Sequence, residues 1–259
     1  MYTKFNEVTA DIEKEFVLNG QLIQVSKWQG LEVKDTVFGN TVELLNYYFQ
    51  YNIPSMNPNK LQTEILANQP WSEAHFLERV SGLPLNPGKE FRNWPYYKSP
   101  ERDAKFRAKE EKFSHTYMER YWHPKMKGLR YETGNLGDVV NQLHKEPTTR
   151  QAYLPMWMSE DTGVLHGGRV PCSLGYHFIL RKNYLHIAYF LRSCDYIRHF
   201  RDDVYLTCRL CIWMIEQLRK KDNCFWNKVS PGILSMNIIS LHMFENDYNF
   251  LFKKESKYI

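Results

Sequence analysis

A cysteine and an arginine-serine pair are the residues of this chain whose types and spacing best suggest chemistry. Cys172 follows a proline in the segment GGRVPCSLGYHF, and Arg192 and Ser193 follow in FLRSCDYIRHFRDD. A thiolate is a strong nucleophile, but a free cysteine has a pKa near ~8.5 and needs a cationic setting to ionise at neutral pH. Arg192, Arg169 and Arg150 are candidate sources of that setting, and a guanidinium beside a hydroxyl also suits a phosphate. The spacing therefore predicts a nucleophile beside an anion site.

Each of these residues also has an ordinary structural interpretation. An isolated cysteine is often a small buried hydrophobe, and an isolated arginine is often a surface or ion-pair residue. Asp202 and Asp203, in the run FRDD, stand where a helix N-cap is common. Cys208 and Cys211 form a C-x-x-C inside a segment with helical spacing, which favours a buried helical face over a metal or redox site. Taken one at a time, the residues leave these interpretations open.

The composition is that of a globular chain of 259 residues, with 43% hydrophobic residues and a formal net charge of +5. The lysines and arginines are scattered among acidic residues, which favours a small anionic ligand over direct binding of nucleic acid. The chain has no apolar run of membrane-spanning length, and its first residues do not resemble a signal peptide. We therefore expect a cytoplasmic enzyme with five reduced cysteines, no metal and no membrane association.

The elements that must position these residues read as a single domain over residues 1–259, without repeats or a linker. Apolar spacing predicts helices over residues 8–19, 41–50, 135–146 and 203–221. Acidic and basic residues three and four apart predict a solvated helix over 100–121. Alternating apolar residues predict strands over 21–27, 151–158, 174–181, 184–191 and 233–241, and the proline-rich residues 53–99 are expected to be irregular with short helices. Helices before and after a group of strands indicate an α+β domain packed on one sheet.

Four motifs follow one another over residues 115–245. The segment VPC ends at Cys172, and LRSCD ends at Asp195 after the next pair of predicted strands. Upstream, NQLHKEPTTRQAYLPMW places Arg150 after a predicted helix, and downstream SLHMF contains His242. In this order and spacing the motifs resemble the thymidylate synthase family, and within it the pyrimidine hydroxymethylase branch found in bacteriophages.

The resemblance implies a fold, a partner and a reaction. The fold would be thymidylate synthase-like α+β, with a large mixed β-sheet packed with helices and a sheet-to-sheet homodimer. Cys172 would attack carbon 6 of a pyrimidine nucleoside monophosphate, and carbon 5 would then attack the one-carbon unit of 5,10-methylenetetrahydrofolate, so that covalent catalysis divides one hard substitution into easier steps. Addition of water would leave a hydroxymethyl group on carbon 5, whereas hydride would leave a methyl group.

The resemblance also assigns residues to the nucleotide. Arg192 and Ser193 would bind its phosphate, joined by Arg150 from the other subunit. His242 would reach the sugar hydroxyl or a water network, and His177, where the family commonly has glutamine, would lie in the nucleotide site.

Three further residues are assigned to the folate and to proton transfer. Asp195 would contact the pterin, and Tyr117 would lie near the proton of carbon 5. Glu43 begins the segment ELLNYY on a predicted helix, the main resemblance in the N-terminal third, and would organise water and proton transfer near the folate.

Asp203 stands where thymidylate synthases have an asparagine, eight residues after Asp195. An amide can donate to oxygen 4 of uracil and accept from its ring nitrogen 3. A carboxylate only accepts, which suits the amino group of cytosine and a nitrogen 3 that gains a proton when carbon 6 is attacked. Opposite uracil it would face oxygen 4 with like polarity, at a cost on the order of 1–3 kcal/mol. The resemblance therefore predicts dCMP or CMP as the substrate and hydroxymethylation as the reaction.

Three positions depart from the family pattern and leave alternatives open. Gln151 replaces a second arginine, His199 replaces a glycine beside the folate, and Phe244 replaces a tyrosine that binds the sugar. The sugar, deoxyribose or ribose, stays open. So do a C5-methyltransferase acting on dCMP or dUMP and a catalytically silent homologue that binds a nucleotide.

Overall fold

The computed structural model describes residues 1–28, 31–33, 39–96, 112–164 and 168–252. Its largest element is a mixed sheet with the strand order β1-β4-β9-β7-β6-β5, in which β8 also pairs with β9. β9 runs parallel to β7 and β8, and the other neighbours are antiparallel. The strands are β1 Gln21–Gln24, β4 Asn40–Asn52, β5 Tyr153–Pro155, β6 Ser173–Arg181, β7 Tyr184–Leu191, β8 Cys194–Asp195 and β9 Ser230–Phe244, with a separate hairpin of β2 Lys27–Trp28 and β3 Leu31–Glu32.

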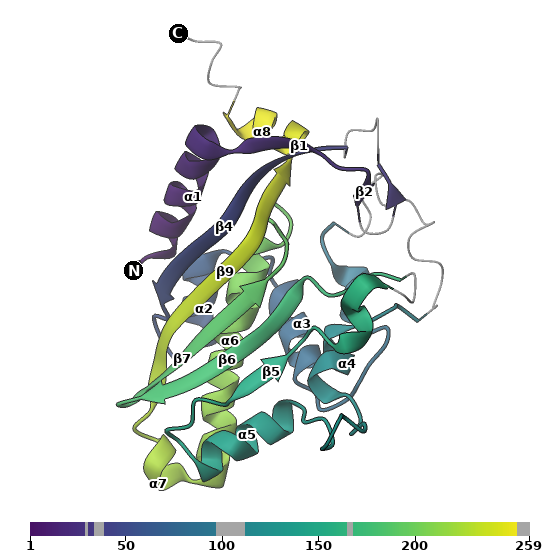
Figure 1. The fold of residues 1–259 in the computed structure, drawn as a ribbon. Helices are drawn as coiled ribbons and strands as arrows, with labels where there is room; N and C mark the ends of the chain where they lie inside the picture. The colour runs from purple at the N-terminus through teal and green to yellow at the C-terminus, as the bar shows by residue number, and fades with distance from the viewer. Residues whose placement is uncertain (29–30, 34–38, 97–111, 165–167, 253–259) are drawn as a thin grey trace.

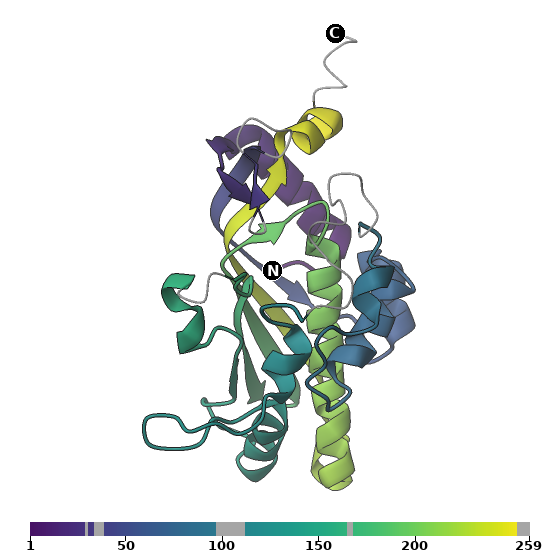
Figure 2. The same cartoon turned by 90° about the vertical axis from the view of Figure 1, so that its right-hand side faces the viewer.

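Helices pack against one face of this sheet, which confirms the α+β class. Figure 1 looks onto the open face of the sheet with α2, α3 and α6 behind it, and Figure 2 shows the same layers from the side. The helices are α1 Phe5–Asn19, α2 Pro58–Ile65, α3 Trp71–Arg79, α4 Tyr117–Trp122, α5 Leu136–Lys145, α6 Phe200–Lys221, α7 Asn223–Trp226 and α8 Glu245–Phe252, with short 3₁₀ helices η1 Glu90–Asn93 and η4 Ser159–Val164. No helix within the described ranges is both long and apolar enough to cross a bilayer.

The core lies between α6 and the sheet. Every second residue of β7, from Leu185 to Leu191, is buried, as the side-chain period of a strand requires. α6 packs against α2, α3, α5, β7 and β9, and Cys208 and Cys211 are fully buried in it. The C-x-x-C therefore belongs to a buried helical face, as the sequence favoured.

The predicted helix over residues 41–50 is wrong, because this segment is strand β4. Val42 and Leu44 are buried before Asn46, and Phe49 and Tyr51 are buried after it, so the buried positions change from even to odd. Asn46 adopts a left-handed backbone with φ 53°, and the pairing with β9 skips it. The register with β9 is the same on both sides of Asn46, so no residue is inserted, and the buried positions of β9 change at the same place, between Ile238 and Leu241. This break in the alternation imitates helical spacing.

The predicted helix over residues 100–121 is correct only at its end. Residues 100–111 lie outside the described part of the chain, and the helix α4 begins at Tyr117. Thr116 caps it by accepting a hydrogen bond from the backbone of Glu119, whose side chain returns a bond to the Thr116 backbone. This capping box fixes the start of the helix, so residues 112–115 before it are not helical.

The remaining predicted elements differ from the observed ones mainly at their ends. β6 and β7 match the predicted strands within one residue, and α5 lies inside its predicted range. α1 and α6 each begin three residues before their predicted starts, β9 is longer at both ends, and β1 and β5 are shorter. Residues 53–96 hold the short helices α2, α3 and η1, as expected.

Candidate active site

A cavity of about 700 Å³ lies where β6 begins and β7 ends. Eight of the ten site residues predicted from the sequence line it: Glu43, Tyr117, Cys172, Arg192, Ser193, Asp195, Asp203 and His242. They come from β4, α4, the two segments that flank β6 and β7, β8, α6 and β9. Arg150 and His177 lie elsewhere. The fold thus gathers residues that are up to two hundred positions apart in the sequence.

Cys172 and Arg192 extend the β6-β7 ladder beyond its last paired residues. The backbone N–H of Arg192 donates to the carbonyl of Cys172 at 2.9 Å. The guanidinium then turns back on the chain before the cysteine: its Nε donates to the carbonyl of Pro171 at 2.8 Å and its Nη2 to that of Val170 at 3.1 Å. Nη2 also lies 4.0 Å from the Sγ atom of Cys172. Arg192 therefore fixes the cysteine loop and brings a positive charge to the thiol.

The thiol of Cys172 is half-buried, and it is not the fully buried hydrophobe of the alternative interpretation. Burial raises its pKa, and the charges of Arg192 and Arg169 oppose that rise without cancelling it. Arg169 lies in the same cavity wall, where the Ser114 hydroxyl donates to its carbonyl at 2.9 Å. The two arginines favour the thiolate, but the protonated thiol is the main form at neutral pH in this structure.

Asp203 lies in the first turn of α6, with its side chain in the cavity wall. Burial raises its pKa from 3.8 to about 7, while the charge of Arg79 holds the pKa down and Asp202 pushes it up. The Sγ atom of Cys194 lies 3.6 Å from its Oδ2. The expectation that Asp203 can only accept hydrogen bonds applies to its ionised form. Near neutral pH the carboxyl group carries a proton part of the time, and it then donates as well as accepts.

Asp202, the neighbour of Asp203, connects α6 to the start of α3. Its carboxylate accepts hydrogen bonds from the backbone and the side chain of Asn68, at 2.9 and 2.8 Å, and from the Ser72 hydroxyl at 2.7 Å. These bonds tie the start of α3 to α6. Neither aspartate caps α6, because His199 occupies the N-cap position.

Glu43 and His242 face each other across β4 and β9. They are paired in register, and the Ser240 hydroxyl donates to the Glu43 carboxylate. The Ser240 oxygen also lies 3.5 Å from Nδ1 of His242. Glu43 therefore reaches the cavity from a strand and not from the predicted helix, and it belongs to a polar group that could hold water.

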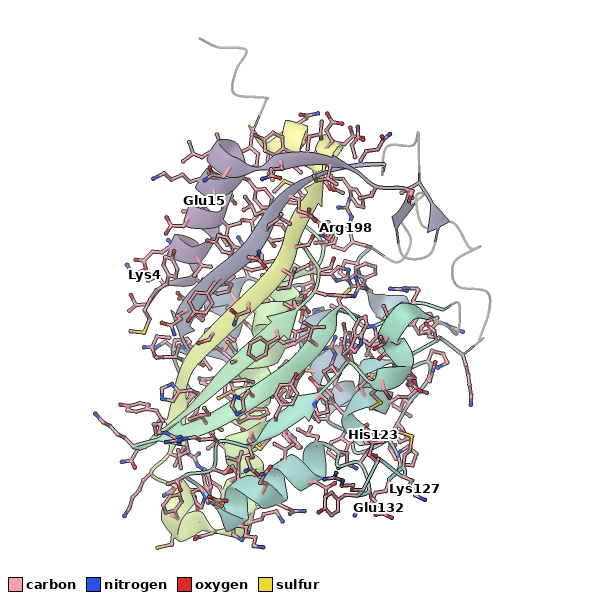
Figure 3. All side chains as sticks on the ribbon, in the orientation of Figure 1. Lys4, Glu15, His123, Lys127, Glu132 and Arg198 are labelled. Atoms are coloured by element: carbon pink, nitrogen blue, oxygen red, sulfur yellow. The ribbon has the colours of Figure 1, made fainter. Side chains whose placement is uncertain are left out.

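Asp195 is held by the turn that follows β8. Its Oδ1 accepts from the backbone N–H groups of Ile197 and Arg198 at 3.0 and 2.9 Å. Its Oδ2 lies 3.4 Å from the guanidinium of Arg198, which also binds Asp247 of α8 at 2.6 Å. Arg198 is labelled beside the end of β9 in Figure 3. The bonds orient one edge of the carboxylate toward its own turn.

An aromatic wall lies next to these polar groups. Trp94 stacks on His199 at a ring distance of 4.8 Å, and Trp71 stacks on His75 at 4.9 Å. All four residues line the cavity. Flat rings of this kind offer a surface on which a planar ligand can stack, and His199 takes part in that surface.

Sequence reasoning missed His75 and Arg79 of α3, both of which line the cavity. Their signal is present but weak. Ser72, Phe76 and Arg79 form the buried face of α3, and a charged residue on the buried face of an amphipathic helix is unusual.

Arg150 and His177 lie outside the cavity. The side chain of Arg150 is exposed, and its carbonyl lies 3.0 Å from Nε2 of His177 on β6. Gln151 is likewise exposed. Phe244 is buried with the guanidinium of Arg198 4.7 Å from its ring, and it is not among the described residues that line the cavity.

Comparisons with known proteins return no family model that matches the chain and no curated protein that matches it. The resemblance given above therefore rests on the motifs. Within the described ranges, no group of three or more His, Cys, Asp or Glu side chains is placed to hold a metal ion.

Proposed function

We propose that this protein adds a hydroxymethyl group to carbon 5 of a cytidine monophosphate, dCMP or CMP, with 5,10-methylenetetrahydrofolate as co-substrate. The observation that carries the proposal is that the thiol of Cys172 and the carboxyl group of Asp203 share one cavity with Arg192. A nucleophile, an acid poised near neutrality and a cation are the groups that attack on a pyrimidine nucleotide requires. The cavity volume of about 700 Å³ is in the range of small-molecule sites.

Asp203 acts first, through both of its oxygens. Its acid form donates to nitrogen 3 of cytosine, and its other oxygen accepts from the amino group. When the thiolate of Cys172 bonds to carbon 6, the electron pair of the ring moves toward nitrogen 3, which takes the proton from Asp203. The carboxylate then accepts from both the ring N–H and the amino group. A pKa of about 7 suits this exchange at neutral pH.

Carbon 5 then becomes the nucleophile. It bonds to the one-carbon unit that the folate supplies. Loss of the carbon 5 proton and departure of tetrahydrofolate from the one-carbon unit then leave an exocyclic methylene group. Water adds to that methylene, and the thiolate of Cys172 leaves carbon 6. Tyr117 lies in the cavity for the proton of carbon 5, and Glu43 with Ser240 and His242 can hold the water. Burial raises the pKa of the Tyr117 phenol, so the phenol stays protonated and would act by a hydrogen bond to the water that takes the proton of carbon 5.

Flat rings support a folate-sized ligand in the same cavity. The stacked pairs Trp94–His199 and Trp71–His75 line it beside Asp195. These residues would hold the pterin against the wall while Asp195 binds its polar edge.

The phosphate would bind at Arg192, Arg169 and Ser193. Two of the guanidinium nitrogens of Arg192 already bind the cysteine loop, and Nη1 has no acceptor among the described residues. Arg169 supplies a second cation in the same wall. Arg169 would therefore take the place of the second arginine, where this chain has Gln151.

A second copy of the chain would supply Arg150. Arg150 is exposed and is not among the described residues that line the cavity of its own chain. The strands also expose apolar side chains, among them Leu45, Tyr48, Tyr153 and Ile239. We therefore propose a homodimer that packs sheet against sheet.

One observation favours a second candidate, a methylase or hydroxymethylase of uridylate. The acid form of Asp203 can donate to oxygen 4 of uracil and accept from its nitrogen 3, so it tolerates uracil when protonated. The stacking of His199 in the cavity also keeps open the silent, nucleotide-binding homologue.

Release of tritium from carbon 5 tests these candidates. The protein is incubated with the folate and with tritiated CMP, dCMP, UMP or dUMP. We expect release from a cytidine monophosphate, and loss of that release in Cys172→Ala. Faster release from a uridine monophosphate would favour the second candidate, and no release from any of the four would support the silent homologue.

A further inference from the structure

Arg79 is a buried arginine at the end of α3 with its guanidinium in the cavity wall. It is only 5% exposed. Its Nε donates to Nε2 of His75 at 2.9 Å, and its guanidinium lies 4.2 Å above the ring of Tyr117. The imidazole and the phenol ring therefore hold the guanidinium from two sides.

The charge of Arg79 has no carboxylate partner within ion-pair distance among the described residues. Other buried arginines of the chain do have one. Arg120 lies 2.9 Å from Asp161, and Arg209 lies 2.9 Å from Glu73. A buried charge without a partner costs free energy, so an unpaired arginine in a cavity wall needs a reason.

His75 orients Arg79 without neutralising it. Because Nε2 accepts from Arg79, the ring proton lies on Nδ1, which faces the Glu78 carboxylate at 3.6 Å. Burial and the charge of Arg79 lower the pKa of His75 to about 4. The imidazole is therefore neutral at physiological pH and serves as an acceptor. Glu78 is itself held by the backbone N–H of Glu90 at 3.3 Å.

Four carboxyl groups line the cavity with Arg79: Glu43, Glu78, Asp195 and Asp203. Ser240 binds Glu43, the backbone of Glu90 binds Glu78 and Arg198 binds Asp195, whereas among the described residues the side chain of Asp203 has only the Cys194 thiol, at 3.6 Å. Asp203 interacts electrostatically with titratable groups from several elements. They are Asp202 on α6, Arg79 on α3, Tyr117 and Tyr121 on α4, Cys172 before β6, Tyr189 on β7 and Cys194 on β8. Within this described set, Arg79 alone is a cation. A nearby positive charge favours the ionised form of a carboxyl group, whereas burial favours the neutral form.

We infer that Arg79 is a positioning residue that acts through Asp203, because its buried charge keeps this carboxyl group able to release a proton to the ring nitrogen of a bound base. The transfer to a base rests on the proposed function, whereas the coupling of Arg79 to Asp203 does not. Without Arg79, only the hydrogen bond from Cys194 opposes the effect of burial on the pKa of Asp203. Asp203 then holds its proton to higher pH and becomes a weaker acid.

A titration of Asp203 in the protein alone tests the coupling. Protein labelled with carboxyl-¹³C aspartate is followed by NMR across pH, and the Asp203 signal is identified by its loss in Asp203→Asn. We expect a wild-type midpoint near 7. In Arg79→Met the midpoint should rise by on the order of one pH unit, whereas Arg79→Lys, which keeps the charge, should stay close to wild type.

Matched variants separate the charge from the fold. Arg130 is exposed and does not line the cavity, and it lies in the sequence between Lys127 and Glu132, which Figure 3 labels. Arg130→Met should therefore leave the midpoint unchanged. If Arg79→Met does not fold, Arg79→Gln removes the charge and keeps a donor for His75. An unchanged midpoint in a folded neutral variant, or equal shifts in the Lys and Met variants, would overturn the inference.

The pH dependence of CMP turnover distinguishes the inference from the proposed function. If both hold, the apparent pKa of Asp203 in the pH profile of kcat/KM should rise in Arg79→Met by the same amount as the NMR midpoint. A shifted NMR midpoint in a protein that turns over no pyrimidine nucleotide would refute the function and keep the coupling. If CMP is turned over, but neither the pH dependence of kcat/KM nor the NMR midpoint of Asp203 changes in Arg79→Met, the inference is refuted and the proposed function is not.

Discussion

The guanidinium of Arg192 lies 4.0 Å from the thiol of Cys172 while it binds the carbonyl oxygens of Val170 and Pro171. One side chain thus shapes the loop that carries the nucleophile and biases its ionisation. The contact is possible because Cys172 directly precedes β6 and Arg192 directly follows β7, the neighbouring antiparallel strand. It also makes the reactivity of the thiol measurable through the arginines around it.

Removal of either arginine should make Cys172 less reactive. The charges of Arg192 and Arg169 lower the thiol pKa against the effect of burial, so Arg192→Met and Arg169→Met should each raise it. At a fixed neutral pH, the alkylation of Cys172 by iodoacetamide should slow by on the order of tenfold for each unit of pKa. Peptide mass spectrometry against pH measures this rate. Arg181→Met, an exposed residue of β6 outside the cavity, is the control, and an unchanged rate in both cavity variants would contradict the account.

Asp203→Asn should move the preference of the enzyme from cytosine toward uracil. The amide can donate to oxygen 4 and accept from nitrogen 3, and it has no proton to give to nitrogen 3 of cytosine. We expect kcat/KM for CMP to fall by on the order of a hundredfold relative to that for UMP. The ratio is measured with both nucleotides in one reaction. An unchanged ratio would show that another residue selects the base.

The same substitution should change how stability depends on pH. The pKa of Asp203 is raised in the folded protein, to about 7 from 3.8, so its contribution is fully present below the ordinary pKa and is lost as pH rises to about 7. Asp203→Asn removes this loss, so the variant should gain in free energy of unfolding relative to wild type between pH 4 and pH 8. At roughly 1.4 kcal/mol per pKa unit, the upper limit of the gain is about 4 kcal/mol. Urea unfolding at the two pH values measures it, and equal pH dependence of the two proteins would refute the raised pKa.

Two inactive variants should restore activity when mixed if Arg150 serves the partner subunit. A heterodimer of Cys172→Ala and Arg150→Ala contains one site with both residues intact. Unfolding and refolding the mixture should therefore give activity above that of either variant. A mixture of Cys172→Ala and Asp203→Ala is the control, because both residues line the same cavity and no intact site forms. A lack of recovery in the first mixture would argue against a shared site.

Much of the fold was predictable because the hydrophobic pattern of β6 and β7 is regular. Where the chain departs from a simple period, prediction failed. The buried positions of β4 change at Asn46, where the backbone is left-handed, and a sequence pattern with such a change resembles a helix. The start of α4 depends on the cap at Thr116, which ends the apparent helical pattern of the charged segment before it.

The candidate site was predictable where its residues follow strands or stand in motifs, as Cys172 and Arg192 do. Arg79 was not, because it enters the cavity from α3, an element that no sequence pattern connects to the cysteine. The raised pKa of Asp203 could not be predicted either. It depends on burial and on the distance to Arg79, which only the folded chain defines.

The most direct test of the central claim is the product formed from CMP or dCMP with isotopically labelled 5,10-methylenetetrahydrofolate. The account predicts a labelled 5-hydroxymethylcytosine nucleotide, identified by mass spectrometry, and none from the Cys172→Ala variant. A nucleotide with no label at carbon 5, or the same product from Cys172→Ala, would contradict it.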